Sequence, residues 1–219
     1  MPYERIGYGL SRKAGRIRDL MLQDEDQAMG LQKLSKLTGV GEPLGCDIKF
    51  NTQHTWVQLA FTFALSDSVD DIIQKSFPVQ ELLEYQVLEG IKVLDIGCSH
   101  IPAYARCARA FGADAYTLDI VSGFYNSGLN EVQKKHELDR HLCLDVNDAE
   151  AVRRIDRDFD LITGAFVIAS HRDYRVETPD PLYLRDISYE HLKEGGYYLD
   201  AGRGFQGALR KTPEAPDKT

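Results

Sequence analysis

The sequence predicts an α/β protein, with a doubly wound, mostly parallel sheet covered by helices on both faces and preceded by a mainly helical N-terminal region. After residue 85, short apolar runs alternate with helical segments, which is typical of parallel strands joined by crossover helices. Before residue 85, apolar residues recur at helical spacing between loops that contain glycine and proline. A length of 219 residues suits one α/β domain with an appendage. We therefore expect a helical cap, lid or dimerisation region over 1–85, a sheet domain over 86–205 and a flexible tail over 206–219.

The N-terminal region is predicted to form four helices and one short strand. The helices are expected over 15–37, 55–65, 67–77 and 79–89. Ser66 or Asp67 can cap the third helix, and Pro78 follows its end. The segment DIKF at 47–50 is the expected strand.

The sheet domain alternates strands and helices in a regular order. Strands are expected over 92–96, 115–120, 141–146, 159–166 and 197–202, and helices over 102–112, 126–138, 147–155 and 182–196. Gly112 can end the first of these helices, Asn147 or Asp148 can cap the third, and a double glycine ends the fourth. Crossovers of this kind wind right-handedly and place helices on both faces of the sheet.

Composition and charge exclude several classes of protein. The net charge of −8 argues against broad affinity for nucleic acids, whose binding depends on neutralising phosphates. The longest apolar runs are too short to cross a bilayer, and the N-terminus lacks the apolar core of a signal peptide, so we expect a cytoplasmic protein. The four cysteines form no CxxC pair and indicate reduced thiols, with no metal site. Five cations near the start of the chain form either a solvated helix face or a contact for an anion or partner: Arg5, Arg12, Lys13, Arg16 and Arg18.

The stretch DIGCSHIP at 95–102 links the first predicted strand of the sheet domain to its helix. In an open α/β sheet, ligands bind at the carboxyl ends of the strands, beside the point where the strand order reverses. This loop is therefore expected to lie against any bound nucleotide. Gly97 permits close backbone approach or a positive φ, Ser99 is small and polar, and Pro102 suits the first turn of a helix.

Three segments and two strand-end acids, in order and over about residues 88–202, resemble the motifs of class I S-adenosylmethionine-dependent methyltransferases. The first, VLDIGCSHIPAYARCARAFGA, is similar to their VLDxGCGxG motif and matches it at Val93, Leu94, Asp95, Gly97 and Cys98. Ser99 and Ile101 replace the second and third glycines. FDLITGAFVIAS resembles the fourth motif of the family, and LKEGGYYL resembles the motif before its fifth strand.

The resemblance implies S-adenosylmethionine as the cofactor and gives roles to three acids. Asp95 would organise the loop, Asp119 would accept hydrogen bonds from the ribose hydroxyls, and Asp145 would lie near the adenine amino group. Each acid also has a structural interpretation, as a loop cap, a strand-end aspartate, or a turn and helix-cap residue. Cys98 is expected to fill space in the loop, with its backbone rather than its sulfur toward the ligand. The cofactor-binding residues implied by the resemblance are Asp95, Gly97, Cys98, Ser99, Asp119, Ile120, Asp145, Val146 and Gly164.

The polar loop SHRDYRVETPDP follows the fourth strand and is expected near the transferable methyl group. His171 and Tyr174 in this loop are the candidate catalytic residues, because the ordinary pKa of histidine suits removal of a proton from a hydroxyl substrate. A solvated loop whose charges satisfy one another is the alternative. A neutral amine acceptor would need no base, so the expected reaction does not depend on either residue.

The sequence departs from the family pattern in two places. VIAS stands where many small-molecule methyltransferases have VLEH, and few residues follow 201 to make the family's final antiparallel hairpin. The hairpin is therefore shortened, absent or replaced by N-terminal residues. We expect methyl transfer to an oxygen or nitrogen of a small molecule, a homodimer through the N-terminal helices, and no nucleic-acid or membrane partner. The alternatives are an inactive cofactor-binding or structural protein, and a nicotinamide enzyme whose loop lacks two of three glycines.

Overall fold

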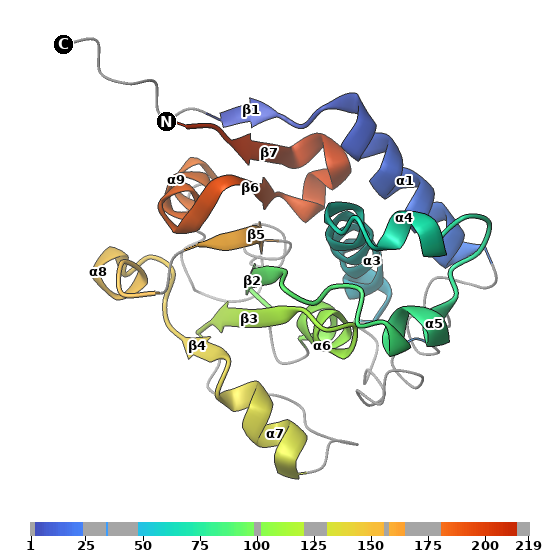
Figure 1. Cartoon of the computed structure of the whole chain (residues 1–219). Helices are drawn as coiled ribbons and strands as arrows, with labels where there is room; N and C mark the ends of the chain where they lie inside the picture. Colours follow the sequence, from blue (N-terminus) through green and yellow to red (C-terminus); the bar gives the residue numbers. More distant parts are fainter. Residues whose placement is uncertain are drawn as a thin grey trace.

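The computed structural model describes residues 3–23, 34, 48–98, 102–120, 131–155, 158–164 and 181–213. Their centre is a seven-stranded sheet with the order β1-β7-β6-β5-β2-β3-β4 (Figure 1). Its strands are β1 Tyr3–Arg5, β2 Lys92–Ile96, β3 Asp114–Asp119, β4 His141–Cys143, β5 Phe159–Gly164, β6 Leu192–Leu199 and β7 Ala208–Lys211.

The middle of the sheet is parallel, as the sequence predicts. β2 pairs in parallel with β3 and β5, β3 with β4, and β5 with β6, whereas β7 pairs antiparallel with both β6 and β1. From β2 the chain moves outward to β3 and β4, and then returns to β5 on the other side of β2. The strand order therefore reverses between β2 and β5, where open α/β sheets bind ligands. The predicted fold class is confirmed.

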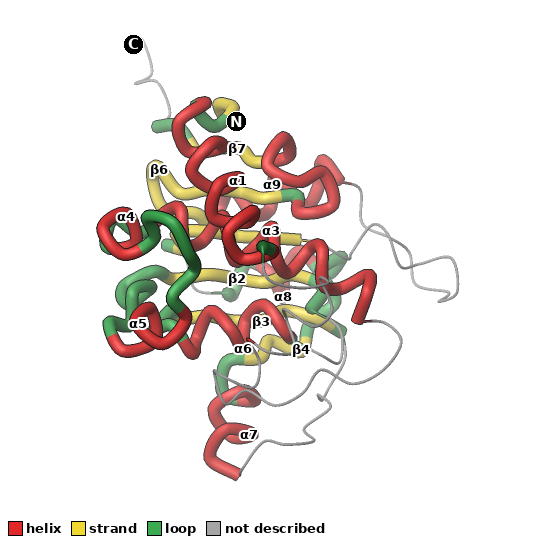
Figure 2. The backbone as a smooth tube through the Cα atoms, turned by 90° about the vertical axis from the view of Figure 1, so that its right-hand side faces the viewer, coloured by secondary structure: helices red, strands yellow, loops and turns green. Residues whose placement is uncertain are grey.

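Helices cover both faces of this sheet (Figures 1 and 2). On one face lie α1 Tyr8–Leu22, α3 Ile48–Leu65 and α6 Ala103–Ala110; on the other lie α8 Ala149–Val152 and α9 Pro181–His191. The remaining described helices are α4 Val69–Ile72, α5 Val79–Glu84, α7 Glu131–Leu138 and the 3-10 helix η1 Ala201–Gly207. None of the described helices combines the length and the apolar character needed to cross a bilayer.

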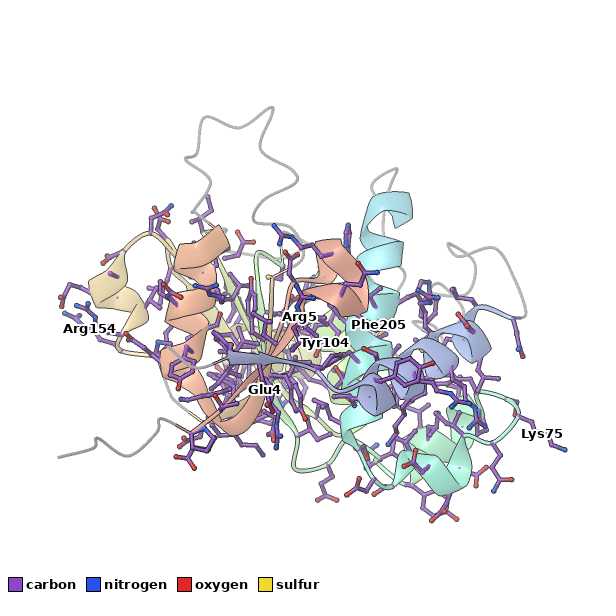
Figure 3. All side chains as sticks on the ribbon, turned by 90° about the horizontal axis from the view of Figure 1, so that it is seen from above. Glu4, Arg5, Lys75, Tyr104, Arg154 and Phe205 are labelled. Carbon is purple, nitrogen blue, oxygen red and sulfur yellow. The ribbon has the colours of Figure 1, made fainter. Side chains whose placement is uncertain are left out.

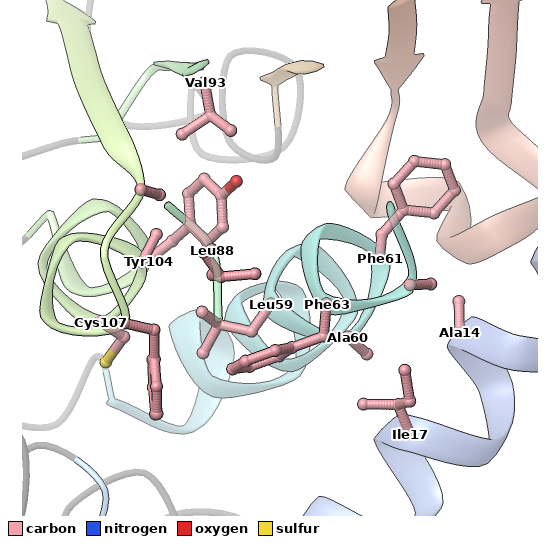
Figure 4. Close-up of a cluster of buried hydrophobic side chains, with 14 of the residues drawn as sticks. Ala14, Ile17, Leu59, Ala60, Phe61, Phe63, Leu88, Val93, Tyr104 and Cys107 are labelled. Atoms are coloured by element: carbon pink, nitrogen blue, oxygen red, sulfur yellow. The ribbon is translucent and has the colours of Figure 1, made fainter. Parts of the chain in front are cut away.

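Two apolar clusters hold the layers together. In the larger one, Phe61 and Phe63 of α3 are fully buried among side chains of α1, α6 and the sheet (Figure 4). The Phe63 ring packs edge-to-face on Phe111 and Phe77, with centroid distances of 5.0 and 5.1 Å. A helix that is apolar around most of its circumference suits this enclosed position. Alternate strand residues such as Leu94 point to the second cluster, beneath α8 and α9.

The N-terminal strand β1 completes the sheet beyond β7. The Tyr3 hydroxyl donates to the Arg185 carbonyl oxygen at 2.9 Å, and its ring packs edge-to-face on Tyr189 with centroids 5.0 Å apart. Glu4 and Arg5 lie on the same edge strand (Figure 3). The C-terminal hairpin is thus shortened to β7, and N-terminal residues supply the outer strand.

The sheet extends past the predicted domain limits at both ends. β7 falls within the predicted tail, and β1 comes from the region predicted to be a helical cap. Ala208 and Leu209 pair with Leu199 and Tyr198 on β6, which covers an edge that β6 would otherwise expose. The sequence ALRK at 208–211 is short and half polar, so the pattern did not reveal a strand there.

Several element boundaries also differ from the prediction. α1 begins at Tyr8 rather than at residue 15, and most of the predicted strand DIKF belongs to α3. α9 ends at His191 and β6 begins at Leu192, where a helix was predicted to continue to the double glycine. Gly195 has a φ of +76°, and the register between β5 and β6 shifts here. The glycines therefore allow a bulge in a strand rather than the end of a helix.

The structure decides between the alternative cap residues predicted for α8 and α4. The Asp148 carboxylate accepts hydrogen bonds from two backbone N–H groups of α8 and is its cap. Ser68 precedes α4, so neither Ser66 nor Asp67 caps that helix. The Ser66 hydroxyl donates instead to the Val87 carbonyl oxygen at 2.6 Å, which ties the end of α3 to the segment before β2.

Tyr3 anchors β1, and its loss should destabilise the fold. Tyr3→Ala removes the hydrogen bond and the ring contact, and we expect it to lower the free energy of unfolding by about 2 kcal/mol. Tyr3→Phe keeps the ring and should cost about 1 kcal/mol. Urea denaturation followed by circular dichroism measures both changes. Tyr8→Ala, at a residue that is 82% exposed, is the control, and equal stability of the two alanine variants would contradict an anchoring role.

Candidate functional site

The carboxyl ends of β5, β2 and β3 lie side by side at the point where the strand order reverses. Asp95 on β2 pairs in register with Thr163 on β5 and with Thr117 on β3. The backbone N–H of Gly97 donates to the Leu118 carbonyl oxygen at 2.8 Å, which continues the pairing beyond β2. Six residues predicted to bind the cofactor are thus brought to one edge: Asp95, Gly97, Cys98, Asp119, Ile120 and Gly164.

Two glycines leave room at this edge. Gly97 has a φ of +75°, in the left-handed region that glycine adopts without a steric penalty. Gly164 pairs with Ile96 across β5 and β2. A Cβ atom built on Gly164 would meet no other atom of the described residues within 4 Å. The described residues therefore leave open the side to which a side chain at this position would point.

Asp95 lies beneath α3 and is only 5% exposed. Its Oδ1 accepts a hydrogen bond of 2.9 Å from Nε2 of Gln58, which also donates to Oγ1 of Thr163 at 3.2 Å. The other carboxyl oxygen, Oδ2, has no hydrogen-bond partner among the described residues. A carboxyl group with one oxygen held and the other available can accept a hydrogen bond from an ammonium group of a ligand.

Burial raises the pKa of Asp95 to about 8. The hydrogen bond from Gln58 opposes this rise, the negative charge of Asp119 adds to it, and the positive charge of Arg109 opposes it. Asp95 therefore holds a proton at neutral pH when no cation lies beside it. A bound ammonium group would favour the ionised form, so its binding would be coupled to release of that proton.

Cys98 and Ile120 flank the two acids of the edge. Cys98 is buried, and burial, together with the charges of Asp95 and Asp119, raises the pKa of its thiol. The sulfur is therefore a neutral thiol without nucleophilic character. Ile120 follows Asp119 directly and is 48% exposed, so it presents apolar surface at the edge.

Asp145 and Val146 follow β4, at the outer end of the same edge. The Asp145 carboxylate accepts hydrogen bonds from the backbone N–H and from Nδ2 of Asn147, at 2.9 and 3.1 Å. This is the turn interpretation that the sequence left open. The Val146 side chain belongs to the cluster beneath α8 and α9. A role in adenine binding for Val146 would have to use its backbone, and the role of both residues stays a prediction.

Three predicted site residues lie outside the described residues, namely Ser99, His171 and Tyr174. Their roles also stay predictions. Within the described part of the chain, no group of three His, Cys, Asp or Glu side chains could hold a metal ion.

Sequence reasoning missed a row of polar residues along α3 that reaches the site. His54, Gln58 and Thr62 of α3 recur every four residues and lie along one side of the helix. Ser66 continues this spacing directly after the last residue of the helix; we call the four residues the α3 polar stripe. Polar residues at this spacing are ordinarily read as a solvated face. Here the stripe faces the protein, and its partners are the Ala201 carbonyl oxygen, the Asp95 and Thr163 side chains, the Tyr104 hydroxyl and the Val87 carbonyl oxygen.

Comparison with known proteins finds similarity only among solved structures, since neither a family model nor a curated protein matches the sequence. The MycE methyltransferase of the mycinamycin biosynthetic pathway, crystallised with Mg and SAH, is 23% identical over 54% of this chain and 29% of its own, with a TM-score of 0.33. An S-adenosylmethionine-dependent O-methyltransferase from Thermotoga maritima is 20% identical over 57% of this chain and 44% of its own, with a TM-score of 0.33.

A third solved structure, a protein from Methanococcus maripaludis named as an S-adenosylmethionine-dependent methyltransferase, is 16% identical. It covers 81% of this chain and 65% of its own, with a TM-score of 0.35. The matched region is thus less than two thirds of each of the three proteins. The function must therefore be inferred from the residues of the site itself.

Asp95 should make stability fall as the pH rises. Its pKa is about 8 in the folded protein and about 3.9 in an unfolded chain, so between these values the folded state holds the additional proton. The contribution of Asp95 is therefore fully present below about pH 4 and is lost as the pH rises through about 8. Asp95→Asn keeps an oxygen for Gln58 and cannot ionise. We expect its stability relative to the wild type to increase from about pH 5 to about pH 8 and then to level off.

Urea denaturation of both proteins at intervals between about pH 5 and pH 9 measures this difference. Groups that titrate in both proteins cancel when the two free energies are subtracted at each pH. A difference that stays constant across the range would contradict a buried, protonated Asp95.

Proposed function

We propose that this chain binds S-adenosylmethionine at the carboxyl edge of β2, β3 and β5 and transfers a methyl group to an oxygen or nitrogen of a small molecule. The proposal rests on the arrangement at the reversal point, where Asp95, the positive-φ Gly97 and Asp119 come from adjacent strand ends. The resemblance of the sequence to methyltransferase motifs falls on these same residues. The net charge of −8 favours a small acceptor over a nucleic acid.

The residues of this edge fit the parts of the cofactor. Oδ2 of Asp95 suits the ammonium group of the methionine part. Gly97 allows a ligand to approach the backbone closely, and the space that the described residues leave beside Gly164 gives room for it. Asp119, at the end of β3, can accept hydrogen bonds from two neighbouring ribose hydroxyls, and the exposed Ile120 offers an apolar contact for the adenine ring.

When bound, S-adenosylmethionine supplies a methyl group on a sulfonium, already activated for in-line displacement by the acceptor. The main task of the protein is then alignment, which contributes about 7–11 kcal/mol in favourable cases. For a hydroxyl acceptor, we propose that His171 receives the proton that the acceptor loses, with Tyr174 as the second candidate catalytic residue of this loop.

A cofactor-binding or structural protein without methyl transfer is the competing proposal. The replacement of two loop glycines by Ser99 and Ile101 favours it. Incubation with methyl-labelled S-adenosylmethionine and a pool of small-molecule acceptors separates the two functions. Label in any acceptor excludes the competing proposal, whereas binding without transfer to any member of the pool supports it.

We also propose a homodimer through the N-terminal helices. Ala14 and Ile17 of α1 are buried in the chain's own core, so a dimer contact would use the exposed side of this helix, which carries Arg12 and Arg16. Sedimentation velocity tests the oligomeric state, and a monomer at high protein concentration would contradict the proposal.

Asp119 is expected to be needed for cofactor binding. Asp119→Ala removes charge-assisted hydrogen bonds of about 1.5–3 kcal/mol, and we expect it to weaken binding of S-adenosylhomocysteine by about 10- to 100-fold. Isothermal titration calorimetry measures the affinity, and a thermal-shift comparison with NAD tests the nicotinamide alternative. Asp114→Ala, at the opposite end of the same strand, is the matched control and should bind normally. Absence of binding by the wild type, or normal binding by Asp119→Ala, would overturn the proposed site.

Gly164 offers a test that separates binding from folding. Because a Cβ here meets no atom of the described residues within 4 Å, Gly164→Ala should leave the stability unchanged or raise it by about 0.5 kcal/mol. Gly164→Val should also fold, since β-branched residues suit strands, but its larger side chain would enter the space assigned to the ligand. We expect the affinity for S-adenosylhomocysteine to be highest in the wild type, lower in Gly164→Ala and lowest in Gly164→Val. Equal affinity of all three proteins would place the ligand elsewhere.

A further inference from the structure

Gln58 is a polar side chain that is buried in the apolar interior of the protein. It is 3% exposed, in the middle of a helix enclosed by α1, α6 and the sheet, and its neighbours Leu59 and Phe61 are fully buried. Burying an amide is unfavourable unless its hydrogen bonds are made. Its Nε2 donates hydrogen bonds to Oδ1 of Asp95 at 2.9 Å and to Oγ1 of Thr163 at 3.2 Å. These two residues are register partners on β2 and β5, so one amide spans the point where the strand order reverses.

Gln58 differs from the rest of the α3 polar stripe in the partner it contacts. His54 and Ser66 contact backbone carbonyl oxygens, and the Thr62 hydroxyl contacts the Gln58 backbone carbonyl oxygen and the Tyr104 hydroxyl. Such contacts align a helix on its neighbours. Gln58 contacts an acid of the candidate site, at the oxygen next to the one without a described partner.

We propose that Gln58 is a positioning residue of the cofactor site, which holds Oδ1 of Asp95 so that Oδ2 is presented in a fixed orientation to the ammonium group of the cofactor. This inference rests on the proposed function. It makes α3, and with it the N-terminal region, a structural part of the site.

The electrostatic surroundings of Asp95 support this role. Among the described residues, the titratable and charged groups that act on it or respond to its charge are Asp119 at the end of β3, Arg109 and Tyr104 on α6, and Cys98 after β2. The neighbours on α3 and β5 are the neutral Gln58 and Thr163. Donation from Gln58 lowers the pKa of Asp95 against the effect of burial, and so favours the ionised form that an ammonium ligand prefers.

The test compares Gln58→Met with Thr62→Val in the full chain. Methionine has a similar length but no donor, whereas Thr62→Val removes the hydroxyl contacts with Tyr104 and with the backbone carbonyl oxygen of Gln58, and leaves the Gln58 side chain and Asp95 unchanged. Calorimetric titration with S-adenosylhomocysteine between about pH 6 and pH 9 gives the affinity and its pH profile. We expect Gln58→Met to weaken binding at pH 7 by about tenfold or more. We also expect the pH range over which the affinity increases to shift to higher pH. Thr62→Val should stay within about twofold of the wild type, with an unchanged profile.

The outcomes separate this inference from the proposed function. If the wild type binds S-adenosylhomocysteine and a folded Gln58→Met matches its affinity and pH profile, the positioning role is wrong and the proposed function stands. An equal loss of affinity in Thr62→Val would also contradict the positioning role, because it would show that Gln58 acts only through the packing of α3. Absence of binding by the wild type overturns the proposed function and this role together. If Gln58→Met does not fold, Gln58→Asn, which keeps an amide but is one methylene shorter, is measured in its place with the same criteria.

Discussion

The burial of one carboxyl group, that of Asp95, constrains the structure around it. A buried acid must either keep its proton or find donors and opposite charge, and here the donor comes from a helix that is distant in sequence. Sliding α3 by one residue along the sheet would break the contact of Gln58 with Asp95 and that of Thr62 with Tyr104 together. The aromatic packing of α3 supplies most of the driving force for its association, but the polar contacts determine where along the sheet it sits.

The described part of the N-terminal region packs closely against the sheet domain. β1 is paired into the sheet, α1 packs along α3, and the α3 polar stripe contacts the sheet, η1 and α6. A lid that swings open would have to break these contacts and expose Phe61 and Phe63 to water, which is strongly unfavourable. The described N-terminal elements are therefore integral to the fold, and a cap, lid or dimerisation role for the region 1–85 stays a prediction. The N-terminal strand β1 also covers β7, which explains how the sheet ends without a full C-terminal hairpin.

The sequence predicts what depends on local pattern and misses what depends on distant pairing. The strand KVLDI and the placing of Asp95, Gly97 and Asp119 at strand ends follow from apolar runs bounded by a glycine loop. The start of β6 does not, because LKEGG continues a helical pattern and its bulge is defined only by pairing with β5. The role of Gln58 is hidden for the same reason, since its two partners lie 37 and 105 residues along the chain.

The charge at the edge also bears on which ligand it suits. Asp95 and Asp119 interact electrostatically, and two ionised carboxylates at one edge would repel each other. Without a ligand, the proton on Asp95 removes this repulsion. A ligand that carries positive charge replaces the proton and lets both acids ionise, whereas the pyrophosphate of a dinucleotide would add negative charge beside them. S-adenosylmethionine carries both a sulfonium and an ammonium group, so the electrostatics of Asp95 favour it over NAD independently of any missing glycine.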